Sequence, residues 1–130
     1  MRVTLIFPPS IATKHTLGFI SVGQPLGIAY LGAALEQQGF EVELIDGLME
    51  GFWRGDTAPP PGYVRISKGQ CQTTPLGDGF PPGSFCVGLS PEQVADRVLA
   101  GNPDVVCMSV IFTSLYRLSL RILEIIKERR

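Results

Sequence analysis

The stretch Arg2–Asp46 is RVTLIFPPSIATKHTLGFISVGQPLGIAYLGAALEQQGFEVELID, and it decides the fold. Its first part, Arg2–Phe7, is a short run rich in β-forming residues that Pro8 and Pro9 stop. Strands buried on both faces have such continuous apolar runs in place of alternation. We therefore expect a buried strand at residues 2–7, followed by a loop over Ser10–Gln24.

The second half of the stretch predicts a helix and another strand. Residues 26–38 (LGIAYLGAALEQQ) have helical character, and Pro25 stands where a helix can begin because its missing N–H needs no partner there. Gly39 suits the C′ position that ends the helix. Glu41–Asp46 (EVELID) has the composition of a short strand. Strand, helix and strand in this order predict a parallel βαβ unit.

The middle of the chain, residues 51–89, has a different character. Residues 51–88 hold eight of the 15 glycines and six of the 11 prolines, so we expect no long regular element there. Five aromatic residues in this part distinguish it from a flexible linker. The composition predicts an ordered excursion with one short strand at Tyr63–Ser67.

Regular structure is expected again from Ser90 onward. Ser90 suits the N-cap of a helix, Pro91 its first position, and Gln93 completes a capping box. This helix should end near Gly101 and Asn102. The apolar run 104–112 (DVVCMSVIF) predicts a third buried strand. A last helix follows, capped by Thr113 or Ser114, with Leu118, Ile122, Ile125 and Ile126 on one face.

Together these elements predict an α/β fold with a doubly wound parallel sheet of the flavodoxin or Rossmann-like type. Three core strands are predicted, whereas open sheets of this kind have about five. We therefore expect residues 1–130 to be the amino-terminal part of such a domain, truncated before its last strands, with the excursion at 51–89 inserted.

Composition and charge exclude several classes of protein. The formal net charge is −1, which gives no basic footprint for nucleic acid. No apolar run approaches the roughly 20 residues that span a bilayer, and no secretory signal is visible. The chain is therefore expected to be cytoplasmic.

The three cysteines are widely spaced, which favours reduced thiols. We expect Cys107 to be a small core residue, and Cys71 and Cys86 to be loop thiols.

In open α/β sheets the ligand lies outside the carboxyl ends of the strands. Topology therefore selects the residues after each predicted strand and at the start of the first helix. The candidate ligand-binding residues are Pro8, Pro9, Ser10, Pro25, Leu26, Gly27, Asp46, Gly47, Ser109, Val110, Ile111, Phe112 and Thr113. No catalytic or metal-ligating residue is expected among them.

The motifs of the commonest ligands of such sheets are missing. The segment after the first strand has neither G-x-G-x-x-G nor a phosphate loop, which disfavours dinucleotides and nucleoside triphosphates. The single histidine, His15, offers little basis for a nucleophile–base pair. The cysteine spacing matches neither a zinc nor an iron–sulfur site.

Four segments resemble a known family: RVTLIFPP, QPLGIAYLGAALEQQGFEVELID, VGLSPEQV and NPDVVCMSV. They are similar, in the same order, to the amino-terminal cobalamin-binding domain of cobalamin-dependent radical SAM enzymes. The resemblance covers residues 1–47 and 87–130. It implies that cobalamin binds at the carboxyl edge of the sheet. It also implies a following radical SAM domain, with a [4Fe-4S] cluster and S-adenosylmethionine, whose C-x-x-x-C-x-x-C motif is not in this chain.

The resemblance further implies that the parent enzyme transfers a methyl group or performs related radical chemistry, while this segment itself has no catalytic residues. Many cobalamin domains ligate cobalt through the histidine of D-x-H-x-x-G. Here residues 15–18 give H-x-x-G without the aspartate that would orient the imidazole, so His15 is not expected to be a ligand.

Other interpretations stay open at this point. One is the amino-terminal half of a two-domain glycosyltransferase, which has a similar helix start but a glycine–histidine pair that is absent here. Another is a non-catalytic α/β interaction module. Pro8 and Pro9 also serve simply to end a strand, and Asp46 fits a turn. The aromatic residues of the excursion either cover a ligand or bury a small cluster of their own.

Overall fold

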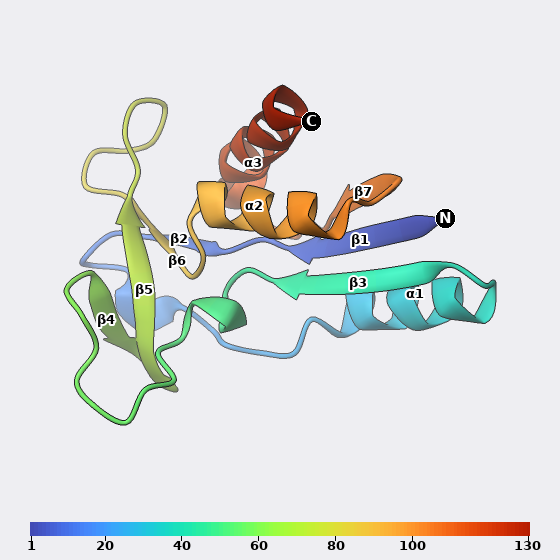
Figure 1. The fold of residues 1–130 in the computed structure, drawn as a ribbon. Coiled ribbons are helices and arrows are strands. Elements are labelled where there is room, and N and C mark those ends of the chain that lie inside the picture. Colours follow the sequence, from blue (N-terminus) through green and yellow to red (C-terminus); the bar gives the residue numbers. More distant parts are fainter.

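The computed structural model describes residues 1–130 and contains two β-sheets (Figure 1). The first is a parallel sheet of β1 (Arg2–Phe7), β3 (Glu41–Asp46) and β7 (Val105–Met108) in the order β3-β1-β7. The second sheet has the order β2-β6-β5-β4 and is antiparallel. The chain is thus an α/β protein of the doubly wound, Rossmann-like type with three strands in its parallel sheet.

Helices cover both faces of the parallel sheet (Figure 1). The register pairs Val3 with Val42 and Val105, and these residues share the face under α1 (Leu26–Gln37). Thr4 and Ile6 point to the opposite face, where α2 (Pro91–Gly101) and α3 (Tyr116–Arg129) pack. The strand predictions for residues 2–7 and 41–46 are confirmed, and the first helix ends one residue earlier than predicted.

Helix α2 begins and ends as its sequence predicts. The Ser90 side chain accepts a hydrogen bond from the Gln93 N–H at 3.1 Å, and the Gln93 side chain accepts one from the Ser90 N–H at 2.9 Å. Pro91 occupies the first turn, where its missing N–H costs nothing. At the other end Asn102 adopts the left-handed conformation with φ of 45°.

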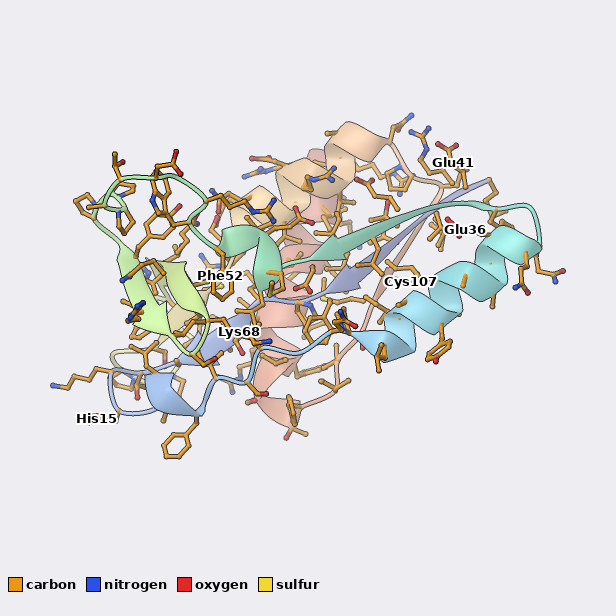
Figure 2. All side chains as sticks on the ribbon, turned by 90° about the horizontal axis from the view of Figure 1, so that it is seen from below. His15, Glu36, Glu41, Phe52, Lys68 and Cys107 are labelled. Carbon is orange, nitrogen blue, oxygen red and sulfur yellow. The ribbon has the colours of Figure 1, made fainter.

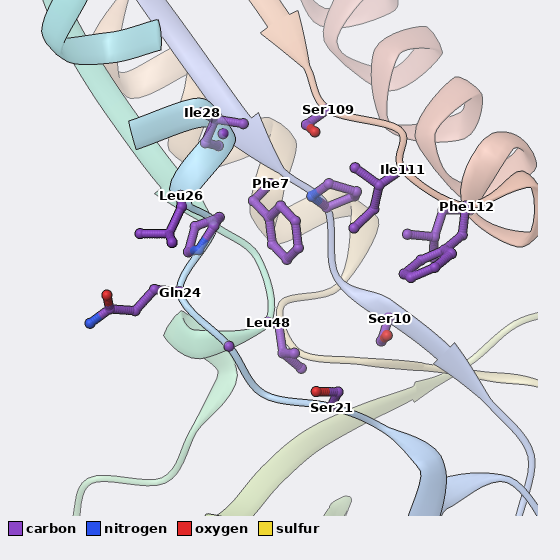
Figure 3. A pocket seen from close by; sticks show the side chains of 15 residues that line it. Phe7, Ser10, Ser21, Gln24, Leu26, Ile28, Leu48, Ser109, Ile111 and Phe112 are labelled. Atoms are coloured by element: carbon purple, nitrogen blue, oxygen red, sulfur yellow. The ribbon is translucent and has the colours of Figure 1, made fainter. Parts of the chain in front are cut away.

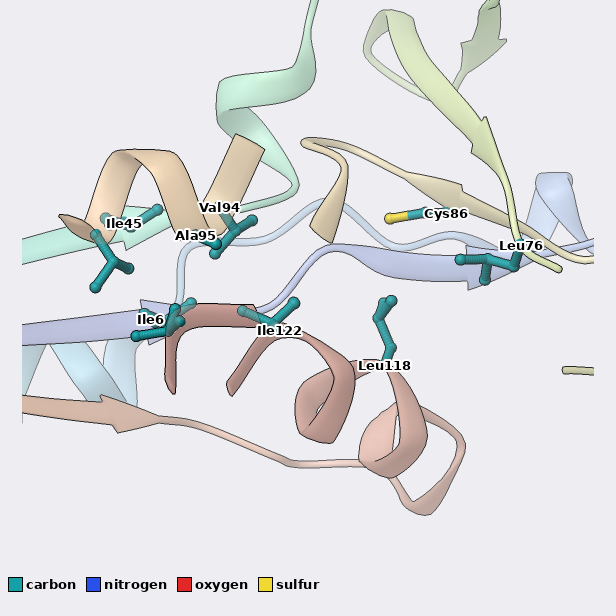
Figure 4. Close-up of a cluster of buried hydrophobic side chains, with 10 residues drawn as sticks. Ile6, Ile45, Leu76, Cys86, Val94, Ala95, Leu118 and Ile122 are labelled. Carbon is teal, nitrogen blue, oxygen red and sulfur yellow. The ribbon is translucent and has the colours of Figure 1, made fainter. Parts of the chain in front are cut away.

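The largest hydrophobic cluster lies between the parallel sheet and the two helices α2 and α3 (Figure 4). Ile6 and Ile45 contribute from the strands and Val94 and Val98 from α2. The predicted apolar face of the last helix supplies the rest: Leu118, Ile122 and Ile126 are buried and Ile125 packs against them. A smaller cluster of Val3, Leu5 and Ile28 lies under α1.

The excursion contains more strand than its composition suggests. Instead of one short strand it forms β4 (Tyr63–Ile66), β5 (Gly69–Pro75) and β6 (Phe85–Val87), and β2 (Ser10–Ala12) joins from the predicted loop. We call this four-stranded unit the accessory sheet. Its face buries Cys71, Val87 and Ala12, among others, in a core of its own. β2, β4 and β6 have only three or four residues, too few for alternation to show, and β2 pairs with a strand far along the chain.

The two sheets meet through three glycines. A Cβ at Gly51 would collide with the Gly88 backbone, and Gly88 itself has φ of +114° and lies against the Gly47 carbonyl. The Leu89 N–H donates to that carbonyl at 2.7 Å. Gly47 and Gly51 leave no space for a Cβ, and Gly88 lacks both that space and a backbone conformation that L-residues adopt. The accessory sheet is therefore joined closely to the end of β3.

Two other expectations, on the third strand and on the last helix, are corrected. The third strand covers only Val105–Met108, because residues 109–112 leave the sheet and contribute a loop at its edge. A 3-10 turn at Thr113–Leu115 precedes α3, so neither Thr113 nor Ser114 caps that helix with its side chain.

The burial of the cysteines is also the reverse of the prediction. Cys71 and Cys86 are fully buried strand residues, not loop thiols, whereas Cys107 is exposed on β7. Burial raises the pKa of the Cys71 thiol to about 11 and that of Cys86 to about 12.

None of the helices combines the length and apolar character needed to cross a membrane.

Candidate functional site

A cavity of about 340 Å³ lies at the carboxyl edge of the parallel sheet (Figure 3). Its upper wall comes from the end of β1, the start of α1 and the loop after β7. The lower wall comes from segments that belong to or adjoin the accessory sheet, namely Ser10, Ser21 and Leu48. Both sheets are thus needed to enclose it.

The local sequence explains this position. Pro8 follows β1, cannot continue the hydrogen-bonded ladder, and lines the cavity where the strand ends. Pro25 and Leu26 start α1 beside it, and Ser109 leaves β7 at the same height. The Ser109 N–H still donates to the Ile6 carbonyl at 2.9 Å, which fixes the loop to the sheet. Parallel strands and the following helix therefore deliver these residues to one edge.

The wall of the cavity has no charged side chain, histidine or cysteine. Its apolar surface is formed by aliphatic and aromatic side chains, while the polar side chains are hydroxyls and one amide. None of these four, Ser10, Ser21, Gln24 and Ser109, is engaged in a side-chain hydrogen bond within the protein. The fifteen lining residues are Phe7, Pro8, Ser10, Ser21, Gly23, Gln24, Pro25, Leu26, Gly27, Ile28, Leu48, Ser109, Ile111, Phe112 and Leu115.

Two glycines leave part of the wall bare. A Cβ built on Gly23 or Gly27 has no atom within 4 Å, so a side chain at either position would point into open space. Gly27 lies in the first turn of α1, where glycine is a poor helix former. Gly27 lines the cavity, and packing against the rest of the protein does not require a glycine at this position.

Eight of the thirteen predicted site residues line the cavity: Pro8, Ser10, Pro25, Leu26, Gly27, Ser109, Ile111 and Phe112. The other five do not. Pro9 is buried, while Val110 and Thr113 are exposed beside the cavity. Asp46 holds a turn, because its carboxylate accepts hydrogen bonds from the Leu48 and Met49 N–H groups at 3.1 and 3.0 Å. Gly47 has no space for a Cβ beside Pro9 and serves packing.

Seven lining residues were not predicted: Phe7, Ser21, Gly23, Gln24, Ile28, Leu48 and Leu115. Phe7, Gln24, Ile28 and Leu48 each lie one residue from a predicted position, so a window widened by one residue would have included them. Ser21–Gln24 belong to the loop before α1, and their approach depends on the path of that loop. Leu48 reaches the cavity because the Asp46 turn redirects the chain after β3. No local signal marks the path of the loop that brings Ser21 and Gly23 to the cavity.

His15 lies apart from the cavity. It is exposed in a turn after β2, and Figure 2 shows it at one end of the molecule. It is not among the lining residues. No group of three or more histidine, cysteine, aspartate or glutamate side chains is close enough to hold a metal ion. The cavity is therefore suited to an uncharged, partly apolar group that accepts and donates hydrogen bonds.

Comparisons with known proteins give one curated relative. The chain is 26% identical over 113 residues to cytidylyl-2-hydroxyethylphosphonate methyltransferase from Streptomyces wedmorensis. The matched region is 87% of this chain but 17% of the relative, so the chain spans about a sixth of that protein's length. No family model and no solved structure matches. The chain is thus similar, at a distance, to one part of a methyltransferase.

Proposed function

We propose that this chain is the cobalamin-binding part of a cobalamin-dependent radical SAM enzyme whose whole chain transfers a methyl group. The observation that carries the proposal is the uncharged cavity at the carboxyl edge, next to the helix start that resembles those enzymes. The similarity to a methyltransferase supports methyl transfer as the overall reaction. The whole protein's substrate is a proposal of the same kind: a phosphonate, the class of compound in the relative's name.

The residues of the cavity fit cobalamin on chemical grounds. The corrin ring is apolar on its faces and carries neutral amide groups around its edge. Phe7, Leu48 and Ile111 offer apolar surface, and the free Ser21 hydroxyl and Gln24 amide are suited to hydrogen bonds with amides. No carboxylate or ammonium group would be left without a partner when such a ligand displaces water.

The protein's own contribution would be to bind and position the cofactor. Cobalamin, when bound, supplies the methyl-carrying or redox chemistry. The chain offers no imidazole at the cavity, so its side chains would exclude water from one face of the corrin instead of ligating the metal. Ser10 is the first residue of β2 and Ser109 directly follows β7, so these strands hold the two hydroxyls in place.

Titration of the folded chain with hydroxocobalamin tests this proposal. We expect micromolar binding with a shift in the visible spectrum of the cofactor. His15→Ala should leave that shift unchanged, because His15 lies outside the cavity. Absence of binding by a chain that unfolds cooperatively would refute the proposal. Binding of a sugar nucleotide in its place would favour the glycosyltransferase interpretation.

A further inference from the structure

Leu48 is the residue through which the core of the accessory sheet reaches the cavity. Its side chain is 4% exposed and packs in that core with Cys71 and Val87. The same side chain lines the cavity at the carboxyl edge of the parallel sheet (Figure 3). A ligand that fills the cavity would meet the accessory core at Leu48, so binding depends on where this side chain lies.

Gly47 anchors the chain directly before Leu48. Its N–H donates to the Phe7 carbonyl at 2.8 Å, and its carbonyl accepts from the Leu89 N–H at 2.7 Å. These bonds tie the turn to the end of β1 on one side and to the segment after β6 on the other. They do not fix the backbone torsions of Leu48 itself, which decide where its side chain points.

The Asp46 carboxylate supplies that constraint. Its Oδ1 accepts hydrogen bonds from the Leu48 N–H at 3.1 Å and from the Met49 N–H at 3.0 Å. These N–H groups belong to the planar peptide groups before and after Leu48. One oxygen therefore holds both planes, and with them the torsions of Leu48, whose φ is −81° and ψ −54°. Aspartate makes such bonds to the following backbone in many turns.

The protein offers the two N–H groups no second acceptor. Other contacts of this residue are made by its carbonyl, which accepts from the Gly51 N–H at 3.2 Å and from the Cys71 thiol at 3.8 Å. Without the carboxylate, the N–H of the buried Leu48 would have no partner, which is unfavourable. We expect the turn to rearrange so that this N–H finds another acceptor, and Leu48 would move with it.

We propose that Asp46 is the positioning residue of the cavity, acting on ligand affinity through Leu48 and not by touching the ligand. The inference rests on the proposed function, because its ligand is cobalamin. Asp46 does not line the cavity, whereas Leu48 does. The accessory sheet thus shapes the ligand site through a single turn at the end of β3.

Titration of the full 130-residue chain with hydroxocobalamin tests this role. Asp46→Ala should bind roughly tenfold more weakly, which corresponds to losing the burial of about half a leucine side chain. Asp46→Asn keeps Oδ1 as an acceptor for both N–H groups and should bind within about twofold of the unmodified chain. Equal losses in the two variants would show that the negative charge acts directly and would overturn the proposal.

Ser90→Ala is the matched control. The Ser90 side chain accepts a backbone N–H bond at the start of α2, much as Asp46 does in its turn, and it lies outside the cavity lining. Both alanine variants should lower the free energy of unfolding in urea, but only Asp46→Ala should weaken binding. An affinity loss of the same size in Ser90→Ala would reduce Asp46 to a general structural role.

A double-mutant cycle identifies the residue through which Asp46 acts. Leu48→Ala should itself weaken binding about tenfold, and adding Asp46→Ala should then weaken it less than twofold further. Because Leu48 is a core residue, Leu48→Val takes its place in the cycle if Leu48→Ala does not unfold cooperatively. The loss caused by Asp46→Ala should again be smaller in that background.

The outcomes separate this inference from the proposed function. Failure of the unmodified chain to bind hydroxocobalamin would refute the proposed function, and the role of Asp46 with it. If the unmodified chain binds, unaltered affinity in Asp46→Ala would overturn the role of Asp46 alone. Fully additive losses in the double-mutant cycle would do the same, because they would show that Asp46 does not act through Leu48.

Discussion

Substitution of Gly27 should change ligand binding without harming the fold. The fold does not require glycine at this position, whereas the residue lines the cavity. A Cβ at Gly27 has no neighbour within 4 Å, and the residue lies in the first turn of α1. Gly27→Ala should therefore fold without strain. Replacing glycine by alanine in a helix stabilises a protein by about 0.5–1 kcal/mol, with less expected in a first turn.

The effect on ligand binding should have the opposite sign. The new side chain would occupy part of a cavity of about 340 Å³ and meet any ligand seated at the helix start. Forced overlap of packed atoms costs about 1–3 kcal/mol. Since about 1.4 kcal/mol is a factor of ten, we expect hydroxocobalamin to bind Gly27→Ala roughly tenfold more weakly. Gly27→Leu should bind more weakly still.

Gly32→Ala provides the matched control on the same helix. A Cβ at Gly32 makes ordinary contacts of 3.5 Å with Leu5 Cδ1 and Val42 Cγ1, away from the cavity. It should raise stability in urea unfolding while leaving the visible titration with hydroxocobalamin unchanged. Unaltered affinity in Gly27→Leu would refute the position of the ligand site. A large loss of stability in Gly27→Ala would refute the open space at that residue.

Three further predictions concern the fold itself. Ser90→Ala removes one half of the capping box with Gln93 and should lower the free energy of unfolding by about 1 kcal/mol, measured in urea. Cys107 alone should react with a thiol reagent in the native chain, while Cys71 and Cys86 should react only after denaturation, as counted by absorbance. Burial raises the pKa of the Cys86 thiol from 9.0 to about 12. The contribution of this thiol to the free energy of unfolding is therefore complete below pH 9 and is lost as the pH rises toward 12. Unfolding free energy should therefore fall less steeply above about pH 9 in Cys86→Ala than in the unmodified chain; equal slopes would contradict this assignment.

Local signals predicted the parts of the fold that depend on local structure. Ser90, Pro91 and Gln93 form their capping box through contacts three residues apart, so the sequence contains all the information needed. The accessory sheet differs because Ser10 pairs with Val87, across most of the chain. Strands this short have too few residues for alternation to appear, and their pairing depends on the tertiary fold.

In the candidate site, too, some positions could be predicted from the sequence and others depended on the tertiary fold. Topology alone placed Pro8, Pro25 and Ser109 at one edge, because strand ends and helix starts converge there in any sheet of this type. Asp46 lies at the same edge but outside the cavity lining, and its carboxylate accepts hydrogen bonds within the turn that it begins. The prediction that Cys107 is a core residue was wrong. An apolar run predicts burial only when both sides of the strand are covered, and β7 is an edge strand.

The accessory sheet gives the cavity its chemical character. A parallel sheet edge by itself commonly receives phosphate at a helix N-terminus. Here the start of α1 faces Leu48 and Ser21, which are held against the sheet's edge by the turn at Asp46 and by the core of the accessory sheet. These segments bring apolar and hydroxyl groups but no cation. An anion at this edge would therefore have only the N–H groups of the first turn of α1 as partners, and the uncharged lining agrees with the neutral, amide-bearing ligand proposed above.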